Sequence, residues 1–584
     1  MIRSSAGLFD MKVRLSEKLL AAFGCLLMPA LAADPTTLIK LDQAGYLPAL
    51  PKVALVSVNA PASDFTVRRA QGGSVVFRAK LGAPVDDADS GDRLQAADFS
   101  SLTSNGSYYI LVPGIGRSWD FAIGPDVYAR PWYLAMRSYY GQRCGIAVDL
   151  GPEFPGFRHA ACHLEGAWHP SSGKTGPRES KGGWHDAGDY GRYVVNSGIS
   201  TGTLLWTWEF FGTRLAKVTL KLPESGNGTP DILNEIRWNL DWMVTMQDED
   251  GGVWHKQTSE QFCPFIMPEA DKLVSYVIGT SQDPYKSSCA TGDFAAVMAI
   301  AERLYKPYDA AFAERALRAA ERAWRWLDRH PDVTFRNPPG VGTGEYGDRN
   351  CGDERLWAAA ELFRTTGAAA YQKFFLDSYA EYSAAIKPVS PQSWANVANL
   401  ALWTYVLAKG TDSAAAAAIR RDSIAAADQL VARSTANGYR ISMTPRDYIW
   451  GSNSVLANYG IQLLVADAFQ HNPRYVETAV EDLHYLLGRN TFSLSFVTRV
   501  GANSFRHPHH RPSGADDNPE PWPGLLSGGP NRGRQDNAMR RLLAADLPPA
   551  KVYVDDQEAY AANEVAINWN APLVFLLAAA LPAK

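Results

Sequence analysis

LANYGIQLLVA, residues 456–466, is the stretch that decides the fold class of most of this chain. Its residues Leu456, Tyr459, Leu463 and Ala466 are spaced by three and four positions, which places them on one face of a helix. The same spacing recurs between residues 127 and 581, where we count about twelve helices and hardly any strand alternation. Twelve helices in about 455 residues can form two concentric rings of six, a barrel.

Helix ends and long loops support this division of the chain. Asp353 to Phe363 and Ser413 to Arg433 are predicted helices, with Gly367 and Gly438 as stops. Loops rich in Gly, Pro, His and Trp interrupt the helices, and we expect them to gather at one mouth of the barrel and present chemistry there. These loops span residues 151–184, 251–286 and 499–534.

The segment from residue 35 to residue 124 has a different periodicity. Short stretches with β character are separated by turns such as Gln71-Gly72-Gly73, which predicts antiparallel hairpins. The segment contains no Cys, so it lacks the inter-sheet disulfide of antibody domains. We predict an immunoglobulin-like β-sandwich over residues 35–124 and an all-α domain over 125–584. The predicted strands are residues 39–41, 53–58, 65–70, 74–80, 93–99, 106–113 and 119–124.

The N-terminus has the layout of an export signal. Met11-Lys12-Val13-Arg14 is basic, Leu19 to Leu31 is almost wholly apolar, and Ala30-Leu31-Ala32 is a small-residue cleavage site. We predict a signal peptide over residues 1–32 and a secreted or periplasmic protein, in a compartment where thiols can oxidise. An uncleaved membrane anchor is the alternative, but the apolar stretch is shorter than the ~20 residues that a spanning helix needs.

Composition excludes several classes of partner. The 584 residues include 57 Lys and Arg against 61 Asp and Glu, a net charge of −4, so nothing favours a nucleic acid. Hydrophobic residues make up 46% of the chain, which is ample for large cores and unlike a disordered protein. We expect a monomer with no membrane association once the signal is removed.

Three carboxylates are candidates for acid–base chemistry. GGWHDAGDYG, residues 182–191, places Asp186 and Asp189 three positions apart among small residues, where they can hold a water as a general base. A turn or a calcium loop would use the same residues. Glu564 precedes an apolar helix, and apolar neighbours would keep it protonated as a general acid. Taken alone, Glu564 is better explained as an ordinary surface glutamate.

Four residues beside this motif are typical metal ligands. Cys144, Cys162, His163 and His185 have the spacing Cys-x17-Cys-His-x21-His, and two Cys with two His form a common closed zinc set. A zinc ion on His185 would hold the loop that carries Asp186. A Cys144–Cys162 disulfide is the alternative. A catalytic zinc is disfavoured, because four protein ligands leave no open position for water.

Two other sets remain open. Cys263, Cys289 and Cys351 are an odd set, in which one pair can form a disulfide that the sequence does not identify. Four acids before or at the start of a predicted helix suit calcium, or are solvated acids that favour the helix dipole. These acids are Glu345, Asp348, Asp353 and Glu354.

Several motifs resemble those of one enzyme family. WHDAGDYGRY (184–193), HPHHRPSGAD (507–516) and YAANEVAINWNAP (560–572) resemble the three signature regions of glycoside hydrolase family 9, which consists largely of cellulases. QAGYLP (43–48) resembles the immunoglobulin-like module in one branch of that family. The resemblance implies an (α/α)6 barrel and an endoglucanase that hydrolyses β-1,4-glucan with inversion at the anomeric carbon.

The resemblance also implies roles for individual residues. Asp189 matches the catalytic base, Asp186 the residue that holds the same water, and Glu564 the general acid, with base and acid about 6.5–9.5 Å apart. His509 and Arg511 match residues that contact the sugar. The family also has the Cys, Cys-His and His pattern as a structural zinc site, and related enzymes often carry calcium. Weaker candidates for sugar contacts are Tyr560, Trp254, His255 and Trp450.

Other functions remain as alternatives. An exo-acting enzyme on the same fold would release cellobiose, glucose or glucosamine from chain ends. A sugar-binding protein without activity is disfavoured, because binding alone has no need of paired carboxylates and a separate acid. A zinc hydrolase would lose activity at once on chelation.

Overall fold

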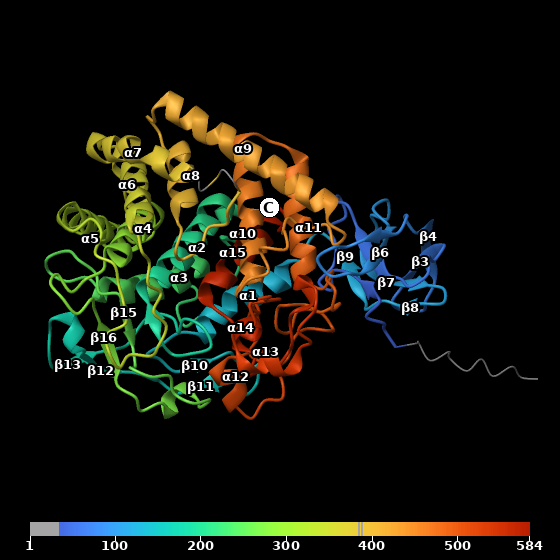
Figure 1. Cartoon of the computed structure of the whole chain (residues 1–584), viewed down its shortest axis with the longest axis horizontal. Helices are drawn as coiled ribbons and strands as arrows, with labels where there is room; N and C mark the ends of the chain where they lie inside the picture. Colours follow the sequence, from blue (N-terminus) through green and yellow to red (C-terminus); the bar gives the residue numbers. More distant parts are fainter. Residues whose placement is uncertain (1–33, 384–385, 387–388, 584) are drawn as a thin grey trace, which may run out of the picture. The chain divides into compact units, whose positions relative to one another are not determined.

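The computed structural model describes residues 34–383, 386 and 389–583. The predicted signal peptide, residues 1–32, lies outside the described residues. Strands β1 to β9 fall between residues 39 and 123, and the first helix begins at residue 129 (Figure 1). Within the described ranges, no helix has both the length and the apolar character needed to cross a membrane.

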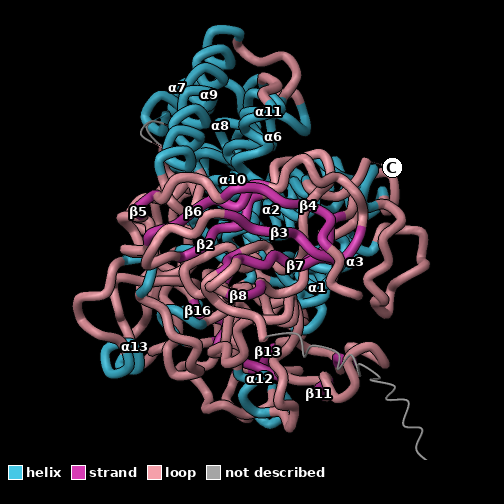
Figure 2. The backbone as a smooth tube through the Cα atoms, turned by 90° about the vertical axis from the view of Figure 1, so that its right-hand side faces the viewer, coloured by secondary structure: helices cyan, strands magenta, loops and turns pink. Residues whose placement is uncertain are grey.

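The N-terminal strands form two antiparallel sheets. One sheet has the order β1-β2-β6-β5, and the other has the order β4-β3-β7-β8, with β9 also paired to β7 (Figure 2). In β7, Tyr108, Ile110 and Val112 are buried and alternate with more exposed residues, so the two sheets enclose one apolar core. The immunoglobulin-like sandwich is confirmed. Its strands are β1 (Ile39–Lys40), β2 (Val53–Ser57), β3 (Asp64–Arg69), β4 (Val75–Lys80), β5 (Val85–Asp86), β6 (Arg93–Asp98), β7 (Gly106–Val112), β8 (Gly116–Arg117) and β9 (Phe121–Ile123).

Six long helices form the inner ring of an (α/α)6 barrel. They are α2 (Val194–Leu215), α4 (Ser288–Tyr305), α6 (Gly352–Thr366), α8 (Ala398–Leu407), α10 (Ser452–Phe469) and α15 (Ile567–Ala579). α2 packs on α4, α4 on α6 and α6 on α8, while α15 packs on both α10 and α2. These helices are buried on nearly all sides; the face of Leu456, Tyr459, Leu463 and Ala466 in α10 is fully enclosed.

Six further helices cover the inner ring from outside. They are α1 (Ala129–Gly141), α3 (Asp231–Thr245), α5 (Ala310–Arg329), α7 (Ala369–Tyr382), α9 (Ser413–Ala436) and α11 (Pro473–Leu486). α3 packs on α2, α5 on α4, α7 on α6, α9 and α11 on α10, and α1 on α15. Side-chain caps begin three of them: Asp309 accepts from the amide of Phe312, Asp412 from that of Ala415 and Asn472 from that of Arg474. The predicted stop at Gly367 is a left-handed C-cap with φ +71°.

Short strands also follow residue 125, where the sequence shows hardly any strand alternation. Among the described residues, seven strands of two to four residues lie in the long loops, and five of them form the mixed sheet β13-β12-β16-β15-β14. Strands this short show no alternation in the sequence, and some of their partners, as with β14 and β15, lie far along the chain. They are β10 (Val148–Asp149), β11 (Arg158–His159), β12 (Glu165–Trp168), β13 (Pro177–Glu179), β14 (Arg192–Tyr193), β15 (Lys256–Thr258) and β16 (Ser275–Ile278).

The long loops gather at one end of the barrel, as predicted. Strands β10 to β16 lie there, in the lower half of Figure 1, with three short helices of the C-terminal part. Figure 2 shows the same grouping below the long helices. The short helices are α12 (Arg511–Ala515), α13 (Asn537–Leu542) and α14 (Tyr560–Asn563).

A buried polar contact joins the sandwich to the barrel. Asp42, which is fully buried, accepts hydrogen bonds from the hydroxyl of Tyr128 (3.0 Å) and from Nδ1 of His484 (2.8 Å). Next to it, the amide of Gln43 donates to the carbonyl of Leu487 (2.9 Å). Because an unpaired buried carboxylate is costly, Asp42 depends on both partners, which belong to the helical part.

Candidate active site

The three sequence motifs meet at the loop end of the barrel. The amide of Arg511 donates to the carbonyl of Gly188 (3.1 Å), and the amide of Ile567 donates to that of Asp186 (2.8 Å). A Cβ at position 188 would lie 2.0 Å from the carbonyl oxygen of His509, so only glycine allows this approach. Backbone contacts between segments more than 300 residues apart therefore build the site.

These motifs line one open cavity of about 930 Å³. Of the nine predicted catalytic and substrate-binding residues, seven contribute to its wall. The predicted catalytic and binding residues thus meet in one place. They come from the loops after α1, α9 and α11 and from α14 and its C-terminal end. The seven are Asp186, Asp189, Glu564, His509, Arg511, Tyr560 and Trp450.

Asp186 is held by two side chains that the sequence did not single out. Its Oδ1 accepts from Nδ2 of Asn196, and its Oδ2 accepts from the hydroxyl of Tyr346 (2.6 Å). Burial, and then the negative charge of Asp189, raise the pKa of Asp186 above its usual range. Two neighbouring carboxyl groups such as those of Asp186 and Asp189 can share a proton or hold a water molecule. Tyr346 lies 160 positions away, and no local pattern marks it.

Among the described residues, only one of the two carboxyl oxygens of Asp189 is held by hydrogen bonds. Its Oδ2 accepts from the amide of Gly191 (2.9 Å) and from the hydroxyl of Tyr193 (3.2 Å). Its Oδ1 has no hydrogen-bond partner within the described part of the chain, and the residue lines the cavity. That oxygen is available to a water molecule. The contacts thus suit a general base.

Glu564 lies in the same cavity at the end of α14. Burial first, and then the charges of Asp189 and Asp186, raise its pKa well above the ordinary range. The backbone at position 564 bridges to that of His509. A carboxyl group that keeps its proton near neutral pH can act as a general acid. The cavity therefore holds a carboxyl group whose pKa is raised together with a carboxyl group, that of Asp189, that has an unpaired oxygen among the described residues.

Exposed aromatic rings line the cavity. Trp450 and Tyr560 are 39% and 36% exposed, with ring centroids 5.4 Å apart. The sequence analysis missed Phe262, which is 47% exposed, and Trp394, both of which also line the cavity. Large exposed rings in a cavity suit the apolar faces of sugars.

Two predicted sugar contacts do not reach the cavity. Trp254 is 2% exposed and its Nε1 donates to the carbonyl of Ser172 (3.1 Å). His255 is 1% exposed and stacks on Phe335 with ring centroids 3.8 Å apart. Both residues are core, which contradicts their prediction as sugar contacts. An aromatic residue in a loop sequence does not reveal which way its ring points.

Arg511 and the neighbouring histidines hold their loop in place, and Arg511 and His509 also line the cavity. The Arg511 guanidinium donates from Nη1 to the carbonyl of Gly188 (2.8 Å) and from Nε and Nη2 to that of Cys263 (3.0 and 2.9 Å). Nδ1 of His509 donates to the carbonyl of Gln557 (2.7 Å), which leaves Nε2 free of that contact. His510 is buried, so it acts as loop filler.

The predicted metal ligands form a cluster. One ligand atom from each of Cys144, Cys162, His163 and His185 lies within 4.8 Å of the others. The two cysteines are free thiols, so the alternative of a Cys144–Cys162 disulfide is wrong for this structure. Nδ1 of His163 is buried without a partner among the described residues, while Nε2 lies 3.2 Å from a carboxylate oxygen of Asp271. The donor set fits a tetrahedral zinc ion with a carboxylate behind one histidine.

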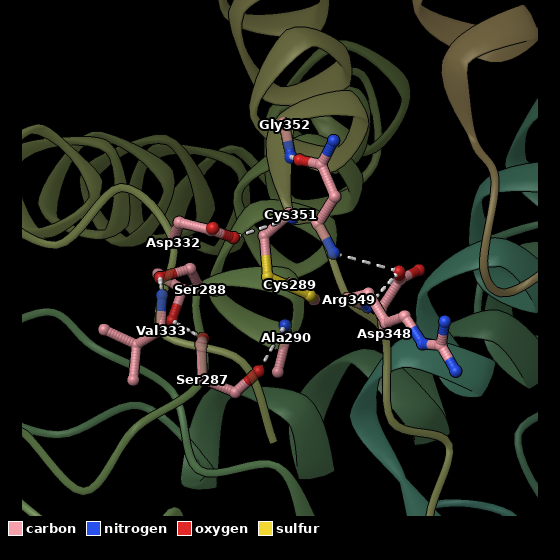
Figure 3. The surroundings of a disulfide bond; sticks show 12 residues. Ser287, Ser288, Cys289, Ala290, Asp332, Val333, Asp348, Arg349, Cys351 and Gly352 are labelled. Carbon is pink, nitrogen blue, oxygen red and sulfur yellow. Dashed lines mark hydrogen bonds between the residues drawn. A yellow bond between two sulfur atoms is a disulfide. The ribbon is translucent and has the colours of Figure 1, made fainter. Parts of the chain in front are cut away.

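The odd set of cysteines is resolved in part. Cys289, near the start of α4, forms a disulfide with Cys351, which precedes α6, and Cys263 is free (Figure 3). Asp348 lies beside this bridge in the loop before α6. The disulfide thus joins two neighbouring helices of the inner ring.

The four predicted calcium ligands do not form one cluster. Glu345 lies in the cavity wall and pairs with Arg336 (2.8 Å). Asp353 and Glu354 are 7% and 0% exposed, so the alternative of solvated helix-start acids is wrong for them. Asp293, which was not predicted, is equally buried, and no described residue pairs with its carboxylate oxygens or with those of Glu354. Burial and neighbouring carboxyl groups raise the pKa of both.

A helical barrel whose open cavity holds several carboxyl groups and exposed aromatic rings is the arrangement expected of a glycoside hydrolase. Comparison with known proteins identifies the family. Residues 128–577 match the model of "Glycosyl hydrolase family 9", and residues 34–117 match that of the "Cellulase N-terminal ig-like domain". The chain belongs to glycosyl hydrolase family 9.

Three relatives illustrate the match. "Endoglucanase D" of Acetivibrio thermocellus is 36% identical over 92% of this chain and 83% of its own length. "Cellodextrinase" of Butyrivibrio fibrisolvens is 36% identical over 93% of this chain and 99% of its own. The crystal structure of a "Zn-binding triple mutant of GH family 9 endoglucanase J30" is 38% identical, with a TM-score of 0.85, and covers 92% of this chain and 100% of that one.

Proposed function

We propose that this protein is a secreted or periplasmic, monomeric endo-β-1,4-glucanase that inverts the anomeric carbon. Asp189 acts as general base, Asp186 holds the same water, and Glu564 acts as general acid. The observation that carries the proposal is one cavity that is lined by Glu564, whose pKa burial raises, and by Asp189, which presents an unpaired oxygen. The name of the A. thermocellus relative, an endoglucanase, supports the substrate class. Export rests on the sequence of residues 1–32.

The reaction follows from the placement of these groups. Glu564 gives its proton to the glycosidic oxygen, so the leaving sugar departs as an alcohol. A water held by Asp186 and Asp189 attacks the opposite face of the sugar, and Asp189 takes its proton. One bond forms to water oxygen, one breaks to the leaving oxygen, and the configuration inverts. Trp450 and Tyr560 offer rings on which the glucan chain can lie.

The acid assignment is tested by Glu564→Gln. The amide has nearly the same shape but cannot donate a proton to the leaving group, so we expect hydrolysis of cello-oligosaccharides to fall by at least about 10³-fold, with affinity retained. Proton NMR of the wild-type reaction should show the α-anomer first. Glu558→Gln, an exposed residue of the same segment, is the matched control and should keep full activity. Unchanged turnover in Glu564→Gln, or the β-anomer appearing first, would refute the proposal.

An exo-acting cellodextrinase is a second candidate, because a relative of that name is equally identical to this chain. An endo-acting enzyme lowers the viscosity of carboxymethylcellulose before much soluble sugar appears. An exo-acting enzyme releases sugar with little change in viscosity. Measuring both quantities in one time course separates the two modes.

Two structural metal sites belong to this proposal. Cys144, Cys162, His163 and His185 would hold zinc, since the thiols are free and the ligand atoms are close together. The buried, unpaired carboxylates of Asp293 and Glu354, with Asp353 and Asp348 beside them, would suit a hard cation such as calcium. Elemental analysis of the dialysed protein tests both: one zinc per chain and one calcium per chain are expected.

A further inference from the structure

Lys256 is a buried cation that the reaction described above does not use. It begins β15, and its side chain has no exposed surface. Its Nζ donates to Oδ1 of Asn337 (2.7 Å), Oγ1 of Thr343 (3.1 Å) and the carbonyl of Gly344 (2.8 Å). All three acceptors are neutral, and all three residues line the cavity. The ammonium group therefore fastens one segment of the cavity wall to β15.

That segment, residues 337–346, leads directly to the catalytic pair. Its last residue, Tyr346, donates its hydroxyl to Oδ2 of Asp186 (2.6 Å). The neighbours of Lys256 on β15 hold the same segment: Oγ1 of Thr258 lies 2.8 Å from Oγ1 of Thr343, and Nε2 of His255 lies 3.0 Å from the carbonyl of Glu345. His255, predicted to contact sugar, thus belongs to this clamp.

Lys256 also brings a positive charge to the site. Burial lowers the pKa of Lys256 to about 7, while the negative charges of Asp189 and Glu345 act in the opposite direction. Lys256 is thus protonated in acidic solution, where its ammonium group has three protons to donate to its three acceptors.

We propose that Lys256 is a positioning residue, which clamps the wall segment 337–346 beside Asp186 and brings a positive charge to the site. The proposal rests on the assignment of Asp189 as the base. Replacing Lys256 should therefore change the pH profile as well as the rate.

Several other charged and titratable groups face these two residues. Their contributions are common to the wild type and to Lys256 variants, so a difference between the two profiles reports the lysine. Around Lys256 and Asp189 they are Asp186, Glu564, Glu345, Tyr193, His509, His169 and His255.

The test compares Lys256→Met, Lys256→Gln and Lys256→Arg by measuring kcat/KM on a cello-oligosaccharide across pH. In Met and Gln the site loses a positive charge, so the acid limb of the pH profile moves to higher pH, by at least about 0.5 unit. kcat at the optimum falls by about 10-fold or more, because the wall segment loses its anchor. Arg keeps the charge but not the geometry, so its acid limb stays in place while kcat falls.

Lys286→Met is the matched control. Lys286 is also mostly buried, but its ammonium pairs with Asp248 (2.7 Å) and Asp250 (3.2 Å) away from the cavity wall. The Lys286→Met substitution should lower the melting temperature and leave the acid limb of the pH profile in place. The Lys256→Gln variant keeps a hydrogen-bond donor, so it replaces Lys256→Met in the test if the Met variant does not fold.

An unmoved acid limb in the folded, uncharged variants would overturn the proposal, as would an equal shift in Lys286→Met. Asp189→Asn tests the base separately. If that variant retained full turnover, the proposed function would fail, whatever the Lys256 variants show.

Discussion

At the residue scale, the hydroxyl of Tyr346 makes one contact on which the catalytic pair depends. It donates to Oδ2 of Asp186 (2.6 Å) and opposes the burial that raises the pKa of that carboxyl. In Tyr346→Phe we expect the pKa of Asp186 to rise further and kcat to fall about 10-fold, equivalent to ~1.4 kcal/mol, with KM little changed. Steady-state kinetics on cellopentaose measure both constants.

Tyr308→Phe provides the comparison for that substitution. Tyr308 is 40% exposed and does not line the cavity, so its hydroxyl should be dispensable. A loss of kcat in both variants, or a rise of KM alone in Tyr346→Phe, would contradict the role given to Tyr346.

At the element scale, the loop between α1 and α2 carries both the zinc ligands and the catalytic pair. His185 directly precedes Asp186, so a zinc ion on that histidine would restrain the loop. We expect slow removal of zinc by a chelator to lower the melting temperature first, with activity lost only as the loop unfolds. Scanning calorimetry, zinc release and residual activity followed in one sample give the order of events.

Two cysteine variants sharpen this experiment. Cys144→Ala removes a ligand and should release zinc and lower the melting temperature, whereas Cys263→Ala removes a free thiol outside the cluster and should retain zinc. Immediate loss of turnover on chelation, with the melting temperature unchanged, would instead indicate a catalytic metal.

At the scale of the whole molecule, the sandwich and the barrel share the buried carboxylate of Asp42. Asp42→Ala leaves the hydroxyl of Tyr128 and the ring of His484 without this acceptor in a fully buried site. We expect the full chain to lose about 3 kcal/mol of unfolding free energy, measured by urea denaturation. Asp86→Ala, in a mostly exposed ion pair with Arg93, should cost less than about 1 kcal/mol. Equal losses of unfolding free energy in the two variants would show that the buried contact between the sandwich and the barrel contributes no more to stability than an exposed ion pair.

The sequence predicted much of the fold and part of the site. The spacing of residues 456–466 and similar stretches predicted the inner helices, because a helix that is buried on all sides must be apolar at every turn. Asp186, Asp189 and Glu564 were found because they lie in dense local motifs. Trp254 and His255 were misassigned, because burial and ring direction depend on neighbours such as Phe335 that lie far along the chain.

The sequence by itself determined which residue types are candidates for the chemistry and which segments become the strands of the sandwich and the long helices, since both are set by local spacing and side-chain character. The short strands of the loops left no such signal. The tertiary structure alone decided which groups meet. It placed Tyr346 on Asp186, Lys256 on the wall segment 337–346, and Cys289 against Cys351. Those contacts join residues tens to hundreds of positions apart, and they form only when packing of the barrel brings its loops to one end.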